Sequence, residues 1–266
     1  MFGTNFWHMV RQYIILWVLV LSVSISAPAQ NFKAPVSGVG IIYNREMALN
    51  LKVTTNRGIA PGIEFGRLRT YYKTTFFHVN VGDIRHPKEY RQSAAPTVSR
   101  SFRPYVFGKQ NSLLALRAGW GTKRYYSEKA RQKGVAVGMS YSFGPTLGVL
   151  KPYYLALKRI ADQPSQSRVS HEKYSEANAQ VFLNNSFIYG ASPFTRGFSE
   201  LSFLPGANAA LALHLDWGAF DEFLKAMEIG IMADVFIRKA PILVAEEQNN
   251  RTFINFFLNL QFGKRR

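Results

Sequence analysis

The stretch Asn208-Ala-Ala-Leu-Ala-Leu-His-Leu-Asp-Trp217 alternates between two kinds of side chain at every residue. One set is apolar and comprises Ala209, Leu211, Leu213, Leu215 and Trp217. The other set is small or polar and comprises Asn208, Ala210, Ala212, His214 and Asp216. Successive side chains of a β-strand point to opposite faces, so this period of two predicts a strand with one apolar and one polar face.

The same alternation recurs along the chain and predicts nine strands in all. The other eight candidates cover residues 49–53, 63–70, 77–81, 114–120, 135–143, 149–158, 229–237 and 254–262. Turn signals between the candidates stand at residues 55–58, 144–145, 218 and 249–250. Residues 84–111 and 159–205 are rich in Pro, Ser, Arg and Gln, and we expect two long loops there with short helices inside them.

Aromatic residues near the predicted strand ends favour a membrane barrel over a soluble β-sandwich. They include Tyr71, Tyr72, Trp120, Tyr125, Tyr126, Tyr141, Phe143, Tyr153, Tyr154, Trp217 and Phe262. Aromatic girdles flank the apolar band of a transmembrane barrel, whereas a sandwich core prefers aliphatic side chains. The expected fold is therefore all-β, an antiparallel transmembrane β-barrel of about eight to ten strands with two long loops.

A bacterial single-chain barrel has an even number of strands, so nine candidates need adjustment. A tenth strand could lie at 36–43 or at 179–189, and a merger of two candidates would give eight. A barrel of either size has a lumen largely filled by side chains.

The composition excludes several other classes of protein. The chain has 266 residues, 33 Lys and Arg against 16 Asp and Glu, and no Cys. The absence of Cys excludes disulfide frameworks, thiol catalysis and Cys-ligated zinc. No zinc finger, RNA-binding aromatic motif or helix-turn-helix pattern accompanies the basic charge, so we expect no nucleic-acid partner.

Residues 1–30 are expected to form a signal peptide rather than part of the fold. Arg11 precedes an apolar run from Tyr13 to Leu21, and the small-residue sequence Ala27-Pro-Ala29 follows. A transmembrane anchor is the alternative, but spanning a bilayer core takes about 20 apolar residues. We therefore expect export, cleavage near Ala29 or Gln30, and an outer-membrane domain of residues 31–266.

Three motifs resemble outer-membrane β-barrel proteins of Bacteroidetes-type bacteria. The run Phe253-Ile-Asn-Phe-Phe-Leu-Asn-Leu-Gln-Phe-Gly-Lys-Arg265 is similar to their closing strand, which commonly ends in an aromatic-Gly-Lys-Arg tail. Residues 124–134 and 83–89 resemble an uncharacterised group among them. The last residue in that family is often aromatic, whereas here it is Arg266, which leaves Phe262 as the candidate assembly signal. The resemblance implies a bacterial outer-membrane location.

Charged residues on the polar strand faces are expected to meet inside the barrel. They are Lys52, Glu64, Arg117, His214, Asp216, Glu228 and Asp234. Unpaired buried charges are costly, so we expect a compensated network of salt bridges. A narrow path for ions or small solutes is the alternative, and it predicts a conductance that changes when Arg117 or Glu228 is neutralised. His78 and His214 share this interior, but they lack neighbouring ligands at fixed spacing, so we expect no metal and no cofactor.

Basic residues cluster in two segments that we interpret as loops. The cations expected to bind an anionic partner are Arg85, Lys88, Arg91, Lys123, Arg124, Lys129 and Arg131. Arg forks and Lys charges suit phosphate-bearing lipid headgroups or an acidic envelope protein, and the barrel surface itself would contact outer-membrane lipid.

Two loop triplets have the residue types of a catalytic triad. They are Asp83, His86 and Ser93, and Ser170, His171 and Glu172. Neither lies in a G-x-S-x-G context, so we expect no enzyme. The expected function is a surface, envelope or secretion-accessory role through the basic loops. A narrow passive channel and a soluble periplasmic β-sandwich are the alternatives.

Overall fold

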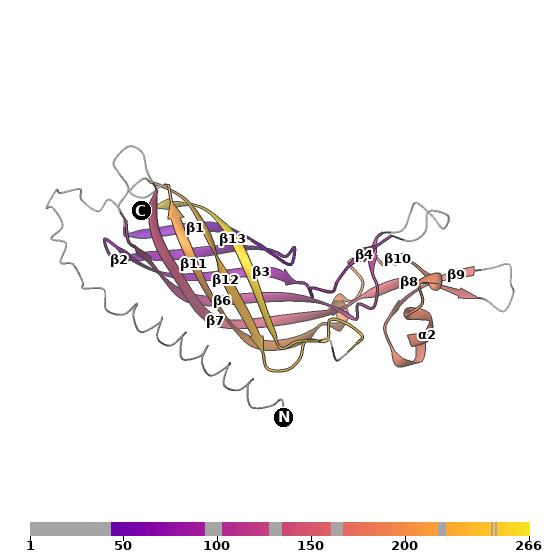
Figure 1. Ribbon diagram of the computed structural model, residues 1–266. Coiled ribbons are helices and arrows are strands. Elements are labelled where there is room, and N and C mark those ends of the chain that lie inside the picture. The colour runs from indigo at the N-terminus through magenta and orange to yellow at the C-terminus, as the bar shows by residue number, and fades with distance from the viewer. Residues whose placement is uncertain are drawn as a thin grey trace, which may run out of the picture. The chain divides into compact units, whose positions relative to one another are not determined.

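The computed structural model describes residues 44–93, 103–127, 135–160, 167–217, 222–245, 247 and 249–266. Within them, eight long strands form a closed antiparallel barrel (Figure 1). In chain order these strands are β1 (Arg45–Thr54), β2 (Ile59–Thr70), β3 (Lys73–Ile84), β6 (Asn111–Tyr125), β7 (Ala136–Pro152), β11 (Ser202–Asp216), β12 (Phe223–Phe236) and β13 (Thr252–Arg265). Each pairs with the next, and β13 closes on β1. The predicted all-β barrel is confirmed, and the sandwich alternative is wrong.

The two ends of the barrel differ. At one end, which we call the terminus end, β1 begins beside the end of β13, and the Arg45 amide donates to the Arg266 carbonyl at 2.7 Å. At the other end, which we call the loop end, residues 55–58 form the predicted tight turn, and the long segments 85–110, 153–201 and 237–251 connect the strands.

The even strand number results from a merger, one of the two solutions expected from the sequence. The candidate at 149–158 is not a barrel strand of its own, because its first residues end β7 and its last residues lie in β8 (Tyr154–Ile160). Residues 179–189 were wrong as a tenth strand, since they hold α2 (Ala179–Phe182), η2 (Asn185–Phe187) and only the start of β10 (Ile188–Ala191). Residues 36–43 lie outside the described residues.

The turn predicted at Gly144-Pro145 is wrong, because both residues lie inside β7. Pro145 has no N–H to donate, and in a closed barrel no strand is an edge. Asn208 on β11 supplies hydrogen bonds at this position, because its Nδ2 donates to the carbonyls of Gly144 and Pro145 at 3.1 and 2.9 Å. A Cβ at Gly144 would lie 2.1 Å from the Ala118 carbonyl oxygen, so the close approach of β6 requires glycine.

The described parts of the long segments at the loop end contain regular structure, and we call the described residues of 153–201, with β4 (Arg91–Gln92) and β5 (Tyr105–Val106), the extension. A three-stranded sheet in the order β10-β8-β9 includes β9 (Ser167–Lys173), and η1 (Glu176–Asn178) and η3 (Phe198–Glu200) are its remaining short helices. Its core contains Tyr105, Leu155, Leu157, Phe182 and Ile188. No helix among the described residues is long and apolar enough to cross a membrane.

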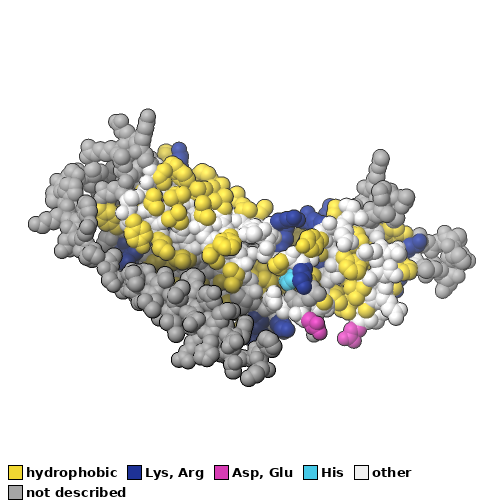
Figure 2. Space-filling model, in the orientation of Figure 1, with side chains coloured by type: hydrophobic (Ala, Val, Ile, Leu, Met, Phe, Trp, Pro, Cys, Tyr) yellow, Lys and Arg dark blue, Asp and Glu magenta, His cyan; other side chains and the backbone are white. Residues whose placement is uncertain are grey.

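The outer wall of the barrel is apolar, and Figure 2 shows hydrophobic side chains spread over it. Along β1 the pattern is strict, with Met47, Leu49, Leu51 and Val53 exposed while Glu46, Asn50 and Lys52 are buried. The barrel therefore encloses polar side chains and exposes apolar ones, the reverse of a water-soluble fold.

Candidate functional site: the charged lumen and the loop-end surface

All the lumen residues predicted from the sequence face inward and are buried. Their exposed fractions are 7% or less, for Lys52, Glu64, Arg117, His214, Asp216, Glu228 and Asp234. Ion pairs join Arg117 to Asp234 and His214 to Glu228, whereas the Lys52 Nζ lies 5.3 Å from the centre of the Phe257 ring.

Among the predicted lumen residues, Arg117 and Asp234 form the ion pair nearer the loop end. The guanidinium Nε and Nη2 donate to the two carboxylate oxygens at 2.7 and 2.9 Å. This fork geometry satisfies both groups where their side chains are only 4% and 0% exposed. The pair therefore ties β6 to β12 across the lumen.

A second group surrounds His214 in the half of the lumen nearer the terminus end. Its Nδ1 lies 3.1 Å from Glu228 Oε1, and Asn259 donates to the other oxygen of that carboxylate at 2.8 Å. The Tyr125 hydroxyl lies 3.2 Å from His214 Nε2 and donates to Asp216 at 3.2 Å. This chain of contacts joins four strands.

The sequence analysis missed the third group, which has Lys123 at its centre. Lys123 is 0% exposed, its Nζ contacts the carboxylate of Glu64, and it lies 3.3 Å from Glu46 Oε1. Gln261 accepts from the same ammonium at 3.2 Å. The prediction that Lys123 is a loop cation is therefore wrong, because β6 continues to Tyr125 and Lys123 shares the inward face of Arg117.

Arg265 was also missed, although it follows the inward parity of β13. Its Nη2 donates to Asp216 Oδ2 at 2.5 Å, and its Nε lies 3.5 Å from Glu46 Oε2. Extending each alternation by three residues beyond the predicted run would have identified Glu46, Lys123 and Arg265.

Apolar side chains fill the lumen at the loop end. The cluster comprises Ile84, Leu113, Ala115, Leu150, Leu204, Phe236, Ala240, Ile242, Leu243 and Phe253, all with 6% exposure or less. Three of these, Ala240, Ile242 and Leu243, come from the segment that follows β12 and fold over the opening. An ion entering from this end would have to displace this core before it reached Arg117.

The basic residues predicted as partner-binding loops do not form one surface. Arg85, Lys88 and Arg91 lie at the loop end, where Arg85 Nε contacts Asp83 at 2.6 Å. Arg124 lies at the terminus end of β6 and is exposed on the outer wall. Lys129 and Arg131 lie outside the described residues. The described members of the two predicted clusters therefore lie at opposite ends of the barrel.

The first candidate triad is not assembled. Asp83 accepts from the Ile59 amide at 3.0 Å and from Arg85, and the buried His86 accepts the Lys88 amide through Nδ1 at 3.2 Å. Ser93 is exposed at the end of β4. The hydrogen bonds of Asp83 and His86 therefore stabilise the local structure.

The second candidate triad is divided between the two faces of β9. Ser170 and Glu172 share one face, where Arg159 donates to Glu172 at 2.6 and 2.8 Å. His171 faces the other way, and its Nδ1 lies 2.7 Å from Ser192 Oγ. Burial lowers the pKa of His171, which favours the neutral imidazole.

The His171–Ser192 pair nevertheless lacks the rest of a hydrolase site. The Ser192 amide donates to the Tyr154 carbonyl at 3.0 Å, so it is not free to stabilise an oxyanion. Among the described residues, no group of three or more His, Cys, Asp or Glu is placed to hold a metal ion.

Comparison with known proteins adds little beyond the fold. No family model and no curated protein matches the chain. A solved structure with a similar arrangement is titled "Crystal structure of the N-terminal beta-barrel domain of Pseudomonas aeruginosa OprF". The similarity has a TM-score of 0.34 and 10% identity, and it covers 84% of this chain and 96% of that chain. The likeness to Bacteroidetes-type barrels stays a prediction.

Proposed function

We propose that this chain is an integral barrel of a bacterial outer membrane, with a closed lumen and a non-enzymatic role performed by the parts outside the bilayer. One observation carries the proposal, namely a closed barrel whose interior is charged and whose outer wall is apolar. Water would favour the reverse arrangement, and the hydrocarbon core of a bilayer favours this one.

We assign this role to the extension. Short turns of such barrels commonly face the periplasm and longer loops face outward, which would place the extension on the cell surface. Its folded core and exposed Arg91, together with the exposed Lys88 just before β4, suit adhesion, envelope integrity or attachment of an accessory partner with anionic groups. This envelope function is the preferred proposal.

A narrow channel is the second candidate, favoured only by the charges in the lumen. The apolar cluster at the loop end and the paired charges below it argue against conduction at rest. In a planar bilayer we expect no conductance from the wild type. Arg117→Ala should stay silent too, because the cluster above it is untouched, and steady conductance in either protein would favour the channel.

The experiment that tests the membrane proposal is an SDS gel of the purified outer-membrane fraction, with boiled and unboiled samples probed for this chain. A faster-migrating unboiled band that shifts on heating would support a detergent-resistant closed barrel in that membrane. Absence of the chain from the membrane fraction, with recovery by osmotic shock, would overturn the proposal.

A further inference from the structure

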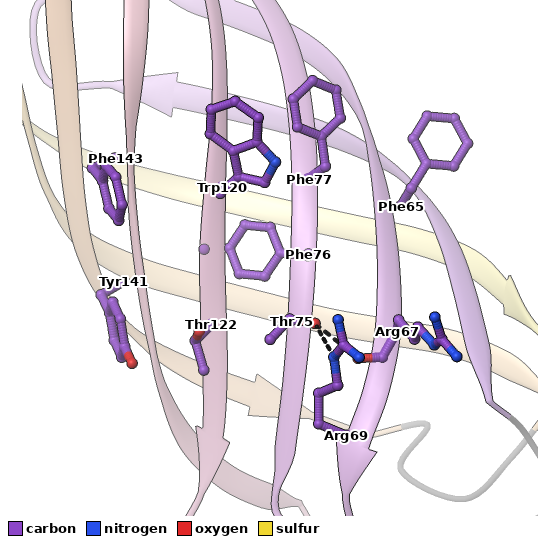
Figure 3. A pocket seen from close by; sticks show the side chains of 11 residues that line it. Phe65, Arg67, Arg69, Thr75, Phe76, Phe77, Trp120, Thr122, Tyr141 and Phe143 are labelled. Carbon is purple, nitrogen blue, oxygen red and sulfur yellow. Dashed lines mark hydrogen bonds between the residues drawn. The ribbon is translucent and has the colours of Figure 1, made fainter.

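Four neighbouring strands place a row of aromatic side chains on the outer wall. The register sets Phe65 opposite Phe77, Phe77 opposite Trp120, and Trp120 opposite Phe143 (Figure 3). The rings of Phe77 and Trp120 have centroids 5.6 Å apart. Trp120 is 59% exposed and Phe143 is 64% exposed. The row therefore forms a continuous apolar ledge across β2, β3, β6 and β7.

One pleat nearer the terminus end, the same strands present a polar row. Arg67 lies opposite Thr75, Thr75 opposite Thr122, and Thr122 opposite Tyr141. The two threonines are short and are flanked by the longer Arg67 and Tyr141, so the wall is hollowed into a groove of about 400 Å³. Figure 3 shows the two rows, one above the other.

The groove is bordered by cations. The Arg69 Nε donates to Thr75 Oγ1 at 3.1 Å, which holds the guanidinium over the floor of the groove. Lys73 lies opposite Arg124 at the next outward position. The outward positions of these four strands carry one carboxylate, Asp83, and it lies at the loop end. The positive charge at the groove is therefore not balanced on this part of the wall.

We propose that this groove binds an anionic glycerophospholipid. Its phosphate lies over Thr75 and Thr122, held by Arg67 and Arg69, and an acyl chain lies along the aromatic ledge. Towards the terminus end, the outward side chains change from apolar to hydroxyl-bearing and then to basic, which is the order of groups in a phospholipid from acyl chain to headgroup. Outward side chains repeat about every 6.7 Å along a strand. Guanidinium groups suit phosphate oxygens, and aromatic rings suit the boundary between chain and headgroup. The proposal rests on the proposed membrane location of the barrel.

The test uses the fluorescence of Trp120, which lies in the ledge. In a chain that keeps Trp120 and carries Trp217→Phe, with Trp7→Phe and Trp17→Phe if the expected signal peptide is retained, quenching by lipids with brominated acyl chains reports lipid contact at the groove. The protein is folded into phosphatidylcholine vesicles that contain a small fraction of brominated phosphatidylglycerol or, separately, of brominated phosphatidylcholine. We expect the anionic lipid to be preferred by at least about fivefold, the factor that one basic side chain contributes near an anionic headgroup.

Two variants and a matched control identify the site. Arg67→Gln/Arg69→Gln should reduce the preference to nearly one, and Thr122→Phe, which fills the groove and keeps every charge, should reduce it as well. Arg238→Gln/Arg251→Gln removes the same charge at the loop end and should leave the preference unchanged. A heat-shift gel confirms that each variant is folded.

The possible results test the lipid site and the membrane location separately. Equal quenching by both lipids in the parent chain, or a preference that survives both groove variants, would overturn the site and leave the membrane barrel intact. Quenching by neither lipid would show that the wall does not face acyl chains, and would overturn the membrane proposal as well.

Discussion

Replacing Lys123 by Met tests whether this side chain is buried in the lumen, as in the structure, or exposed in a loop, as the sequence suggested. An exposed loop lysine would change the free energy of unfolding by about 0.5 kcal/mol or less. In the structure, the ammonium is within 3.3 Å of Glu46 Oε1 and contacts Glu64 as well. At an effective dielectric constant of about 20, the attraction to Glu46 alone is about 5 kcal/mol. Much of it is offset by dehydration of the ammonium, and removing one partner of a buried pair costs about 3–5 kcal/mol.

The assay is equilibrium unfolding by urea in a zwitterionic detergent, followed by tryptophan fluorescence and by the heat-shift gel. Arg124→Met is the matched control, because Arg124 is the next residue in β6 and points to the outer wall. The double variant Lys123→Met/Glu64→Gln should regain part of the loss, since one uncompensated carboxylate is removed. A Lys123→Met loss below about 1 kcal/mol, or one equal to that of Arg124→Met, would refute the buried cluster.

Three further predictions concern the wall and the extension. Leu211→Arg, in the middle third of β11, should lower the free energy of unfolding in lipid vesicles by about 2–4 kcal/mol, and Phe203→Arg near the strand end by about 0–1 kcal/mol; equal losses would contradict an apolar membrane belt. The hydrogen bond from Arg159 lowers the pKa of Glu172 to about 2 from an ordinary 4.5, so its ionised form stabilises the extension above pH 4.5 and is lost as the pH falls towards 2. Hydrogen exchange in β8 and β9, corrected for intrinsic rate, should therefore rise over that range in the wild type, and Glu172→Gln should abolish that rise. A fluorophosphonate probe should leave Ser192 unlabelled, and labelling there would contradict the non-enzymatic proposal.

The barrel strands could be predicted because their signal is local. Alternation at 209–217 and 254–262 specifies both the strand and the face of each side chain, and β11 and β13 carry that pattern. Strand ends were less certain, because a charge at the end of an alternating run reads equally as a loop residue. Lys123 is the example, since its pairing with Thr74 on β3 and Ser140 on β7 shows that β6 extends past it.

The extension and the Pro145 position could not be predicted, for a different reason. Both depend on pairings that join residues far apart in the sequence. Leu155 pairs with Ala191, and Asn208 supplies hydrogen bonds to the carbonyls around Pro145. Neighbouring residues alone favour a turn at Gly144-Pro145, and tertiary pairing overrides that preference.

The proposed location in a bilayer is supported by side-chain volume as much as by polarity. Eight strands enclose a lumen just wide enough for side chains, and here several inward positions already require glycine. A Cβ at Gly121 would lie 2.3 Å from the ring of Phe76, and one at Gly66 would lie 2.4 Å from Glu46. The larger apolar set of the alternation, with Phe65 and Trp120 in it, cannot fit inside such a barrel in place of the present residues. Because the closed sheet leaves only one other face, these side chains must point outward, and an apolar belt around a closed barrel is stable where the surroundings are hydrocarbon.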